Sequence, residues 1–298
     1  MTAYKSHISV CICTFKRAEL LRRLLEALEN QQTGEAFTFS IVVADNDAAE
    51  SAKPTAVDFA ARCRRTITYC SEPRQNIALA RNKALDHATG DYIAFIDDDE
   101  FPTANWLGTL FGACEMYRSD GVLGPVRPHF DEPPPQWIVK GRFCERPEHS
   151  TGTVMPWEQS RTGNLLFKRS ILGDACHAFN PEFGNGGEDK DFFMRMTQQG
   201  RSFIWCNEAV AYETVPPSRW KRSYMLKRAL LRGKNILKHP GAKSGPLARS
   251  LAAVPLYFVV LPLLLLCGQH WFMKYCIKLC DHLGRILALA GLNPVSER

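Results

Sequence analysis

Several features of secreted and zinc-binding proteins are missing from this chain. Its 298 residues include eleven cysteines, but none of these forms a C-x-x-C pair. Cys11 and Cys13 lie two positions apart in an apolar run, where we expect them to pack as small hydrophobic side chains rather than to bind zinc. Residues 1–7 are polar and the apolar run after them is only as long as a strand, so no signal peptide is expected. These absences favour a reduced, cytosolic compartment.

Negative charge is missing from a long stretch near the carboxyl end. Neither Asp nor Glu occurs between Thr214 and Cys280, although the net charge of the whole chain is only +6. The cations in this stretch include Arg219, Lys221, Arg222, Lys227, Arg228, Arg232, Lys234, Lys238, Lys243 and Arg249. A basic block of this kind suits an anionic surface, which is either nucleic acid or acidic lipid headgroups.

Formal charge of either sign is absent from the part of the chain that follows. Residues 250–273 contain no Asp, Glu, Lys or Arg, and most of them are apolar. A transmembrane helix needs about 20 such residues, and basic residues ahead of the run place that flank in the cytoplasm. Pro255 and Pro262 also allow a kinked or re-entrant helix, and a buried core helix is the soluble alternative. We therefore expect a membrane-associated helical segment, which either spans the bilayer or lies in one leaflet.

What the chain does contain is a run of four carboxylates directly after a short apolar stretch. Residues 93–96 read Ile-Ala-Phe-Ile, and residues 97–100 read Asp-Asp-Asp-Glu. A buried strand cannot carry these charges, so they are expected at its carboxyl end, the edge of an α/β sheet where ligands bind. Carboxylates this close repel one another unless a cation such as Mg²⁺ or Mn²⁺ lies between them. The alternative is a solvated acidic turn that begins the next helix.

The spacing of apolar residues alternates between that of strands and that of helices up to about residue 124. Strands are expected at residues 7–13, 39–44, 66–70, 92–96 and 121–124. Helices are expected at residues 18–30, 54–63, 76–88 and 105–117. Strands that alternate with helices predict an α/β fold, with a doubly wound, mostly parallel sheet flanked by helices.

The pattern changes after residue 130. A long irregular segment is expected at 131–161, of the kind found in lids and binding loops. A glycine-rich turn at 184–191 is expected to deliver acids onto the start of the next helix. The remaining elements expected are strands at 162–168, 203–205 and 209–212, and helices at 192–199 and 218–238.

Four motifs occur in order along the first third of the chain, and a fifth follows later. They are Val-Cys-Ile-Cys-Thr-Phe-Lys-Arg at 10–17, Val-Val-Ala-Asp-Asn at 42–46, Asn76 with Ala-Arg-Asn at 80–82, Ile-Asp-Asp-Asp at 96–99 and Gly-Gly-Glu-Asp at 186–189. In this order and spacing, the chain resembles inverting glycosyltransferases of family 2, which have the GT-A fold, over roughly residues 8–233. The acidic run and the basic tail resemble the bacterial exopolysaccharide glucosyltransferases of the succinoglycan type. The resemblance implies a GT-A catalytic domain at 1–240 and a hydrophobic, membrane-associated segment at 241–298.

The resemblance also assigns residues to a nucleotide-sugar donor. Thr14 and Arg17 lie just past the first strand, where a nucleotide would meet the sheet edge. Asp45 matches the aspartate that the family uses for uracil, although the second acid usual beside it is an alanine here. Arg81 is expected to reach ribose or phosphate, and Asp98 is expected to contact ribose. The structural alternatives are a turn residue at a strand end for Asp45 and a solvated helix face for Arg81.

The resemblance also assigns residues to a metal site and to the role of catalytic base. Asp97 and Asp99 bracket the family's metal motif and would bind Mn²⁺ or Mg²⁺, which neutralises the departing nucleoside diphosphate. Inversion at the anomeric carbon needs one base on the opposite face. Asp189 is expected in this catalytic role, with Glu188 orienting the acceptor or substituting for it. The alternative is an acidic helix start, in which Asp191 pairs with the arginine four residues on.

These expectations describe a metal-dependent glycosyltransferase that moves a sugar from a nucleotide-diphospho-sugar, with a UDP-sugar favoured, to a glycan or lipid-linked acceptor in cell-surface polysaccharide biosynthesis. The expected location is the cytoplasmic face of the inner (plasma) membrane. A nucleotidyltransferase acting on sugar phosphates is the alternative, but it would want a glycine-rich loop after the first strand, and residues 14–17 contain no glycine. A nucleic-acid binder is disfavoured, because the acidic sheet edge would repel phosphate. The sequence does not specify the donor sugar, the acceptor, the linkage or the oligomeric state.

Overall fold

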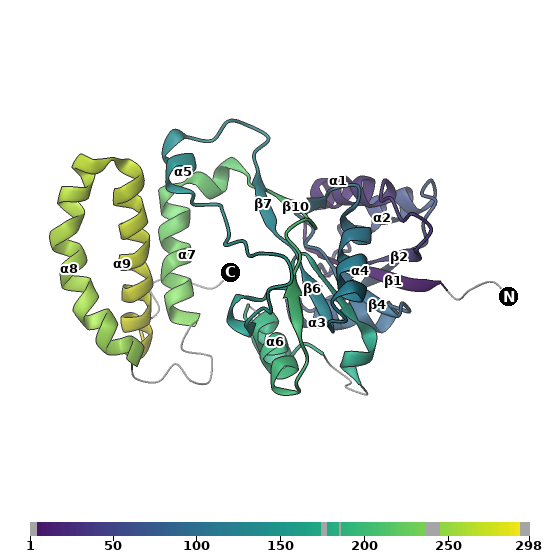
Figure 1. The fold of residues 1–298 in the computed structure, drawn as a ribbon. Helices are drawn as coiled ribbons and strands as arrows, with labels where there is room; N and C mark the ends of the chain where they lie inside the picture. Colours follow the sequence, from purple (N-terminus) through teal and green to yellow (C-terminus); the bar gives the residue numbers. More distant parts are fainter. Residues whose placement is uncertain (1–4, 174–177, 185, 236–244, 293–298) are drawn as a thin grey trace. The chain divides into compact units, whose positions relative to one another are not determined.

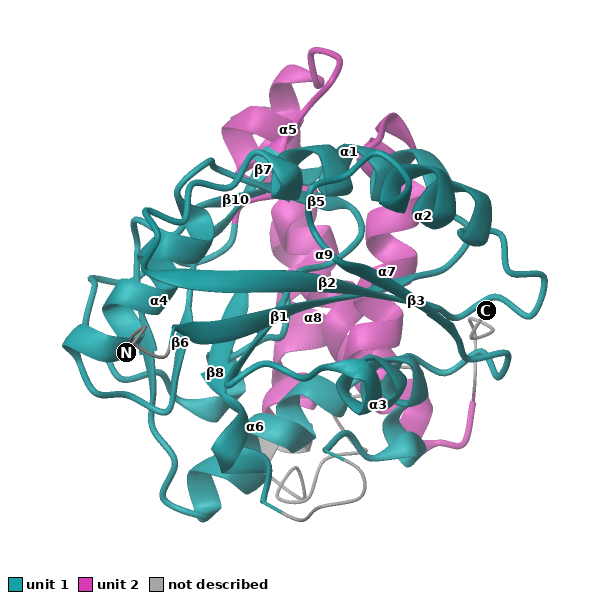
Figure 2. Cartoon of the chain, turned by 90° about the vertical axis from the view of Figure 1, so that its right-hand side faces the viewer, with its two compact units in different colours: residues 1–128, 146–214 teal, residues 129–145, 215–298 magenta. Residues whose placement is uncertain are grey.

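The computed structural model describes residues 5–173, 178–184, 186–235 and 245–292. These residues form two compact units, one made of residues 1–128 and 146–214 and the other of residues 129–145 and 215–298 (Figure 2). The boundary expected between residues 240 and 241 lies outside the described residues, so that division of the chain stays a prediction. Each unit is described by itself below.

A seven-stranded sheet forms the centre of the first unit. Its strand order is β3-β2-β1-β4-β8-β6-β9, and β8 is the one strand that runs against its neighbours. The strands are β1 (Ser6–Thr14), β2 (Phe37–Asp45), β3 (Ile67–Ser71), β4 (Tyr92–Phe95), β6 (Gly121–Leu123), β8 (Leu165–Lys168) and β9 (Phe203–Trp205). The order places β1 and β4 side by side, so the residues that follow each of them meet at one edge of the sheet.

Side chains of β1 alternate between two hydrophobic cores, as the period of a strand requires. Val10 and Ile12 face the core built with α1 (Ala18–Glu29), α2 (Lys53–Ala60) and α4 (Trp106–Met116). Cys11 and Cys13 face the core built with α3 (Ile77–His87) and α6 (Glu188–Gln198). Helices therefore cover both faces of the sheet (Figure 1). The expected α/β fold, with a mostly parallel sheet flanked by helices, is confirmed.

A second, three-stranded sheet lies beyond the acidic run and was not expected from the sequence. It has the order β5-β10-β7, formed by β5 (Glu100–Pro102), β10 (Ala211–Thr214) and β7 (Val126–His129). The amide of Thr214 donates to the carbonyl of Asp99 over 2.8 Å, which ties this sheet to the acidic run. The strand expected at 209–212 overlaps β10, whereas no sequence pattern indicated β5 or β7, because strands of three or four residues are too short to show a period.

Three expected elements have different bounds in the structure. The helix expected from residue 192 begins four residues earlier, because α6 takes Glu188 into its first turn. The helix expected at 218–238 is a 3₁₀ turn, Pro217–Trp220, followed by α7 (Arg222–Asn235), and its last three expected residues lie outside the described residues. The segment expected to be irregular from residue 131 contains a short helix, α5 (Gln136–Gly141).

Long helices dominate the second unit. After α7 come α8 (Gly245–Cys267) and α9 (Gln269–Leu289), and the three lie side by side (Figure 1). Residues 249–267 of α8 have a mean hydropathy of 2.4 and are only 11% buried, so this helix is long and apolar enough to cross a membrane. Gly233 and Gly284 allow α7 and α9 to approach closely, because a Cβ at either position would lie within about 2.2 Å of a backbone carbonyl of the other helix.

Candidate active site

The acidic run lies at the carboxyl end of β4, as the sequence predicts. Asp98, Asp99 and Glu100 are buried, whereas the side chain of Asp97 is 46% exposed. The run turns directly from β4 into β5, so consecutive carboxylates point in different directions instead of lining one strand. One exposed and three buried acids in a single turn require cations nearby, because desolvation strongly disfavours unpaired charge.

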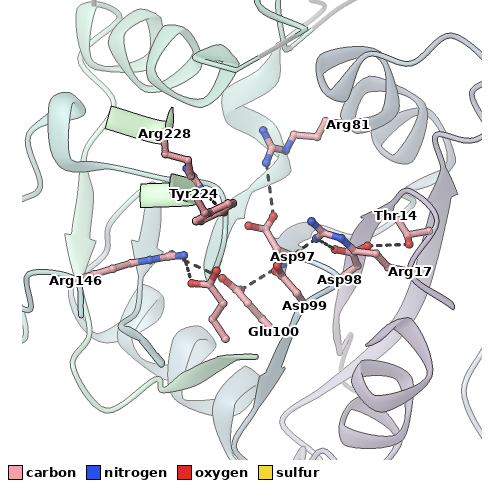
Figure 3. A network of polar contacts seen from close by, with 11 residues as sticks. Thr14, Arg17, Arg81, Asp97, Asp98, Asp99, Glu100, Arg146, Tyr224 and Arg228 are labelled. Carbon is pink, nitrogen blue, oxygen red and sulfur yellow. Dashed lines mark hydrogen bonds and ion pairs between the residues drawn. The ribbon is translucent and has the colours of Figure 1, made fainter. Parts of the chain in front are cut away.

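Asp98 binds two residues that follow β1. The hydroxyl of Thr14 donates to Asp98 Oδ2 over 2.9 Å, and Nη1 of Arg17 donates to Asp98 Oδ1 over 2.8 Å (Figure 3). Arg17 also reaches Asp99 Oδ2 at 3.2 Å. Burial raises the pKa of Asp98 to about 6, and Arg17 opposes that rise. The structure therefore brings together three residues that were expected to bind the nucleotide-sugar, and two of them, Thr14 and Arg17, donate hydrogen bonds to the third, Asp98.

Arg81 connects the acidic run with the carboxylates of α6. This guanidinium is buried, its Nη2 lies 3.7 Å from Asp97 Oδ1 (Figure 3), and its Nη1 donates to Glu188 Oε1. Asp97 of the acidic run and Glu188 of α6 therefore lie on either side of one guanidinium. Arg81 does not lie on a solvated helix face, which was the structural alternative for it.

Two asparagines of the α3 motif hold the segment that leads to α6. Asn76 caps α3 by accepting from the amide of Leu79, and its Nδ2 donates to the carbonyl of Pro181 over 2.9 Å. Asn82 and Phe179 exchange two hydrogen bonds, of 2.7 and 2.9 Å. These contacts fasten residues 178–184 to the helix that carries Arg81. The asparagines of this motif thus position the segment before α6 relative to α3, the helix that carries Arg81.

The two glycines before α6 form a turn, as expected from the sequence, and both have positive φ angles. Gly186 has a φ of 117° and Gly187 a φ of 102°, a region that side chains other than glycine rarely adopt. The turn directs the first residues of α6 toward α3. Glu188, next in the chain, is buried against Arg81, and burial raises the pKa of its carboxyl while Arg81 opposes the rise.

Asp189 occupies a different environment from its neighbour. Its side chain is partly exposed, and Oδ1 accepts from the amide of Lys190 over 2.7 Å. Its carboxylate is therefore open to contact from outside the protein, whereas the carboxylate of Glu188 is buried and its Oε1 is engaged by Arg81. Asp191 pairs with Arg195 at 2.8 Å within the helix, which confirms the structural role expected for it.

Arg146 is a member of this site that no sequence pattern indicated. Its Nη1 lies 3.8 Å from Glu100 Oε1, and its Nη2 donates to Glu213 (Figure 3). It comes from the segment without apolar periodicity, so no pattern marks it. Burial raises the pKa of Glu100 well above its usual range, as does Asp97, and Arg146 acts in the opposite direction. Arg146 thus supplies positive charge to the side of the acidic run that Arg81 and Arg17 do not reach.

Gly163 lies next to two carboxylates of the acidic run. A Cβ at this position would lie 2.9 Å from both Asp97 Oδ2 and Glu100 Oε1. Only glycine leaves both carboxylates where they are. This residue precedes β8, and no sequence motif distinguishes it.

Asp45 is fully buried at the end of β2. Its oxygens accept from the amides of Asp47 at 3.1 Å and Ala52 at 2.8 Å, and from the hydroxyl of Tyr69 at 3.1 Å. The carboxylate therefore organises the loop between β2 and α2. Its contact with a base stays a prediction.

The acids present suit a metal site that a ligand completes. Within the described ranges, no group of three or more His, Cys, Asp or Glu side chains is arranged to hold a metal. Asp97 and Asp99 offer two carboxylates, and Mg²⁺ usually takes one or two from the protein and the rest of its ligands from water and substrate phosphates. The donor set therefore fits a divalent cation that binds together with a diphosphate.

Comparison with known proteins shows which family the chain belongs to. The model of glycosyl transferase family 2 matches residues 9–181, which is more than half of the chain. The chain belongs to this family. It is also 35% identical over 231 residues to the succinoglycan biosynthesis protein ExoM of Rhizobium meliloti, which covers 76% of this chain and 73% of the relative. This family 2 chain is therefore a glycosyltransferase, related to enzymes of exopolysaccharide biosynthesis.

Solved structures identify the fold of the family 2 chain as GT-A. The mannosyltransferase PcManGT of Pyrobaculum calidifontis, in complex with GDP-Man and Mn²⁺, aligns with a TM-score of 0.65 at 17% identity over 98% of this chain and 89% of its own. S. aureus TarS 1–349, in complex with UDP-GlcNAc, aligns with a TM-score of 0.54 at 15% identity over 97% and 93%. At these identities the likeness concerns the fold alone.

Proposed function

We propose that this chain is a metal-dependent, inverting glycosyltransferase that moves a sugar from a nucleotide-diphospho-sugar, a UDP-sugar, to a glycan or lipid-linked saccharide in the assembly of a cell-surface polysaccharide. One observation carries the proposal: Arg81 contacts both Asp97 of the acidic run and Glu188 of α6. A donor held at the first and an acceptor held at the second would share one site. Membership of family 2 favours this activity over a nucleotidyltransferase.

Asp97 and Asp99 would hold the divalent cation, Mn²⁺ or Mg²⁺, through oxygen ligands. When bound, the ion supplies Lewis-acid neutralisation of the leaving nucleoside diphosphate. Thr14, Arg17 and Asp98 surround the neighbouring position at the end of β1 and are assigned to the ribose and phosphates. The guanidinium of Arg17, which donates to Asp98, is also suited to bind phosphate.

Asp189 is assigned as the base. Its carboxylate accepts the proton of the acceptor hydroxyl as the acceptor oxygen bonds to the anomeric carbon, while the bond from that carbon to the diphosphate oxygen breaks. Glu188 is assigned a positioning role, because its carboxylate is buried in the pair with Arg81. The partial exposure of Asp189 supports this division of roles.

The apolar helix α8 is assigned to the membrane, and the protein to its cytoplasmic face. A core helix of a soluble protein would be mostly buried, whereas the apolar stretch at 249–267 is 11% buried. Lipid-linked acceptors reside in the same membrane, so anchoring would concentrate enzyme and acceptor in two dimensions.

Donor turnover is the direct test of the proposed activity. Purified full-length protein is incubated with UDP-, GDP- and dTDP-sugars with Mn²⁺, with Mg²⁺ or with a chelator, and the release of nucleoside diphosphate is measured. We expect release with a UDP-sugar and a divalent cation only. Water takes the place of the acceptor in this assay, so the anomeric configuration of the released sugar, read by NMR before mutarotation, must be opposite to that of the donor. Retained configuration, or equal release in the chelator, would contradict the proposal.

A further inference from the structure

One side of α8 is apolar along its whole length. Residues 250–273 contain no Asp, Glu, Lys or Arg. The large side chains on the outward side are each at least 56% exposed: Leu251, Leu256, Phe258, Val259, Leu263, Leu265 and Leu266. A continuous apolar surface of this kind marks a contact with another apolar phase. The proposed function assigns α8 to the membrane, and the structure bears on whether the helix crosses that membrane or lies in it.

The opposite side of α8 is covered by α9. The ring of Tyr257 packs on those of Tyr275 and His282, with centroids 5.9 and 5.7 Å apart. Nearer the start of α8, the hydroxyl of Ser250 lies 3.0 Å from Nδ1 of His282. Gly268 is the single residue between the two helices, which therefore run antiparallel and side by side (Figure 1). A position of α8 in the membrane thus also determines the position of α9.

The charges of α9 are incompatible with the hydrocarbon core of a membrane. Lys274 and Lys278 are both exposed. Lys278 lies ten residues beyond Gly268, which is about 15 Å along the helix. If α8 crossed a core of about 30 Å and turned back at Gly268, Lys278 would lie near the middle of that core. A charged side chain at this depth is strongly disfavoured.

Contacts with α7 hold α9 in place, so α8 cannot enter the membrane and leave α9 bound to nothing else. Arg232 of α7 donates to Asp281 of α9 through Nε at 2.9 Å and Nη2 at 2.8 Å. The backbones also approach closely, because a Cβ at Gly284 would lie 2.2 Å from the carbonyl oxygen of Leu230. A spanning α8 would therefore have to break its contacts with α9 or draw the charged pair of α7 and α9 toward the lipid.

Both ends of the apolar side carry residues typical of the headgroup region. Arg249 is exposed at the start of α8. Beyond the turn at Gly268, Trp271 is 43% exposed, and Nζ of Lys274 lies 5.5 Å from the centroid of its ring. Tryptophan and basic side chains favour the interface between hydrocarbon and water, and the cations attract acidic headgroups. The surface that covers α8 is therefore expected to contain acidic lipids.

We propose that α8 lies in the plane of the membrane within one leaflet, with its outward side among the acyl chains and α9 on the side of the headgroups. The helix does not cross the bilayer. This inference rests on the proposed assignment of α8 to the membrane and specifies how the two are in contact. A helix in this position enters the boundary between headgroups and acyl chains by about 5–10 Å. That depth immerses the side chain of Phe258 and leaves Lys278 outside the hydrocarbon core.

Three exposed residues of α8 at a spacing of seven provide the test. Leu251, Phe258 and Leu265 are 56%, 61% and 56% exposed. Seven residues make nearly two helical turns, so the three side chains point to one side, and the first and last lie about 21 Å apart along the helix. Since all three face outward, a label at any of them displaces no packed neighbour.

The depth of each position is measured by EPR spectroscopy. A nitroxide is attached through a genetically encoded p-acetylphenylalanine, which leaves the eleven native cysteines unchanged. The full-length chain is reconstituted into vesicles of phosphatidylcholine and phosphatidylglycerol, and collision rates with oxygen and with a water-soluble nickel complex give the depth. We expect the three depths to agree within about 4 Å, because the helix axis is parallel to the membrane. A label at Met116, which is 78% exposed on α4 of the first unit, serves as the apolar control and should remain in water.

Three results would overturn the inference. One is that Phe258 lies about 10 Å deeper than both other positions, as in a spanning helix. Another is a steady change of depth from Leu251 to Leu265, which would indicate that one end of α8 is inserted. In both cases the assignment of α8 to the membrane stands. The last is that the α8 positions match Met116, which would remove that assignment as well. None of these readouts involves sugar transfer, so the proposed activity is tested separately.

Discussion

Arg81 and Glu188, 107 positions apart in the sequence, form a buried ion pair. The same guanidinium lies 3.7 Å from Asp97, so one side chain balances carboxylates from both halves of the site. Removing a partner from such a pair leaves buried charge without compensation. The pair therefore engages Glu188 in the fold and leaves the neighbouring carboxylate of Asp189, which is partly exposed, outside it.

Asp189→Asn should abolish sugar transfer while the donor still binds. The amide cannot accept the acceptor's proton, and loss of a general base usually lowers turnover by about 10²- to 10⁴-fold. Turnover is measured by nucleoside diphosphate release and donor affinity by calorimetry. Asp191→Asn, on the same helix but paired with Arg195, serves as the control and should keep most of the activity. Near-normal turnover in Asp189→Asn would show that the base lies elsewhere.

Asp99→Ala should weaken donor binding only when a divalent cation is present. One of the two carboxylates assigned to the ion is lost, so metal affinity should fall by at least about tenfold. Donor affinity is compared with Mn²⁺ and with a chelator in both proteins. In the parent protein, donor affinity should be higher with Mn²⁺ than with the chelator. In the variant, the donor affinities measured with Mn²⁺ and with the chelator should be nearly equal. A variant that keeps the full benefit of the ion would remove Asp99 from the metal site.

Arg146→Met should lower the stability of the first unit by about 3 kcal/mol, because Glu100 and Glu213 lose a buried partner. Burial already raises the pKa of Glu100, and losing Arg146 raises it further. When the pKa of a carboxyl is higher in the folded than in the unfolded protein, the free energy of unfolding falls as the pH rises past the unfolded-state pKa, which is about 4.3 for Glu. The deficit, measured by thermal unfolding, should therefore be larger at pH 8 than at pH 5.

Adding Glu213→Gln to Arg146→Met should recover part of the lost stability, since the carboxylate to which Arg146 donates is then replaced by a neutral amide. If the double variant is less stable than the single one, the ion pair is not the cause of the deficit. This comparison separates charge from the loss of the arginine's packing.

Gly163→Ala should lower activity while the fold is kept. The new methyl group would lie 2.9 Å from oxygens of Asp97 and Glu100, so both carboxylates must shift. Gly112→Ala is the matched control, because a Cβ there meets nothing within 4 Å. Donor turnover and circular dichroism are measured for both. Unchanged turnover in Gly163→Ala would mean that the exact position of Asp97 matters little.

The parts of the structure that local patterns describe were predictable. The alternation of strands and helices gave the sheet, and the abrupt change from apolar to acidic at Ile96 gave the position of the acidic run. The parts that depend on contacts between distant segments were not. Arg146 lies in a segment with no period, and its partners Glu100 and Glu213 are 46 and 67 positions away. Only the folded chain brings such residues together.

The helix α3 acts on the site as a single rigid spacer. Within seven residues it carries a cap that touches Pro181, a guanidinium that touches two acids, and an amide that touches Phe179. One residue inserted between Asn76 and Arg81 would rotate everything after it by about 100° and advance it by about 1.5 Å. The contacts of Arg81 and Asn82 would then be lost together, so a change of length within this helix should disrupt the site as a whole.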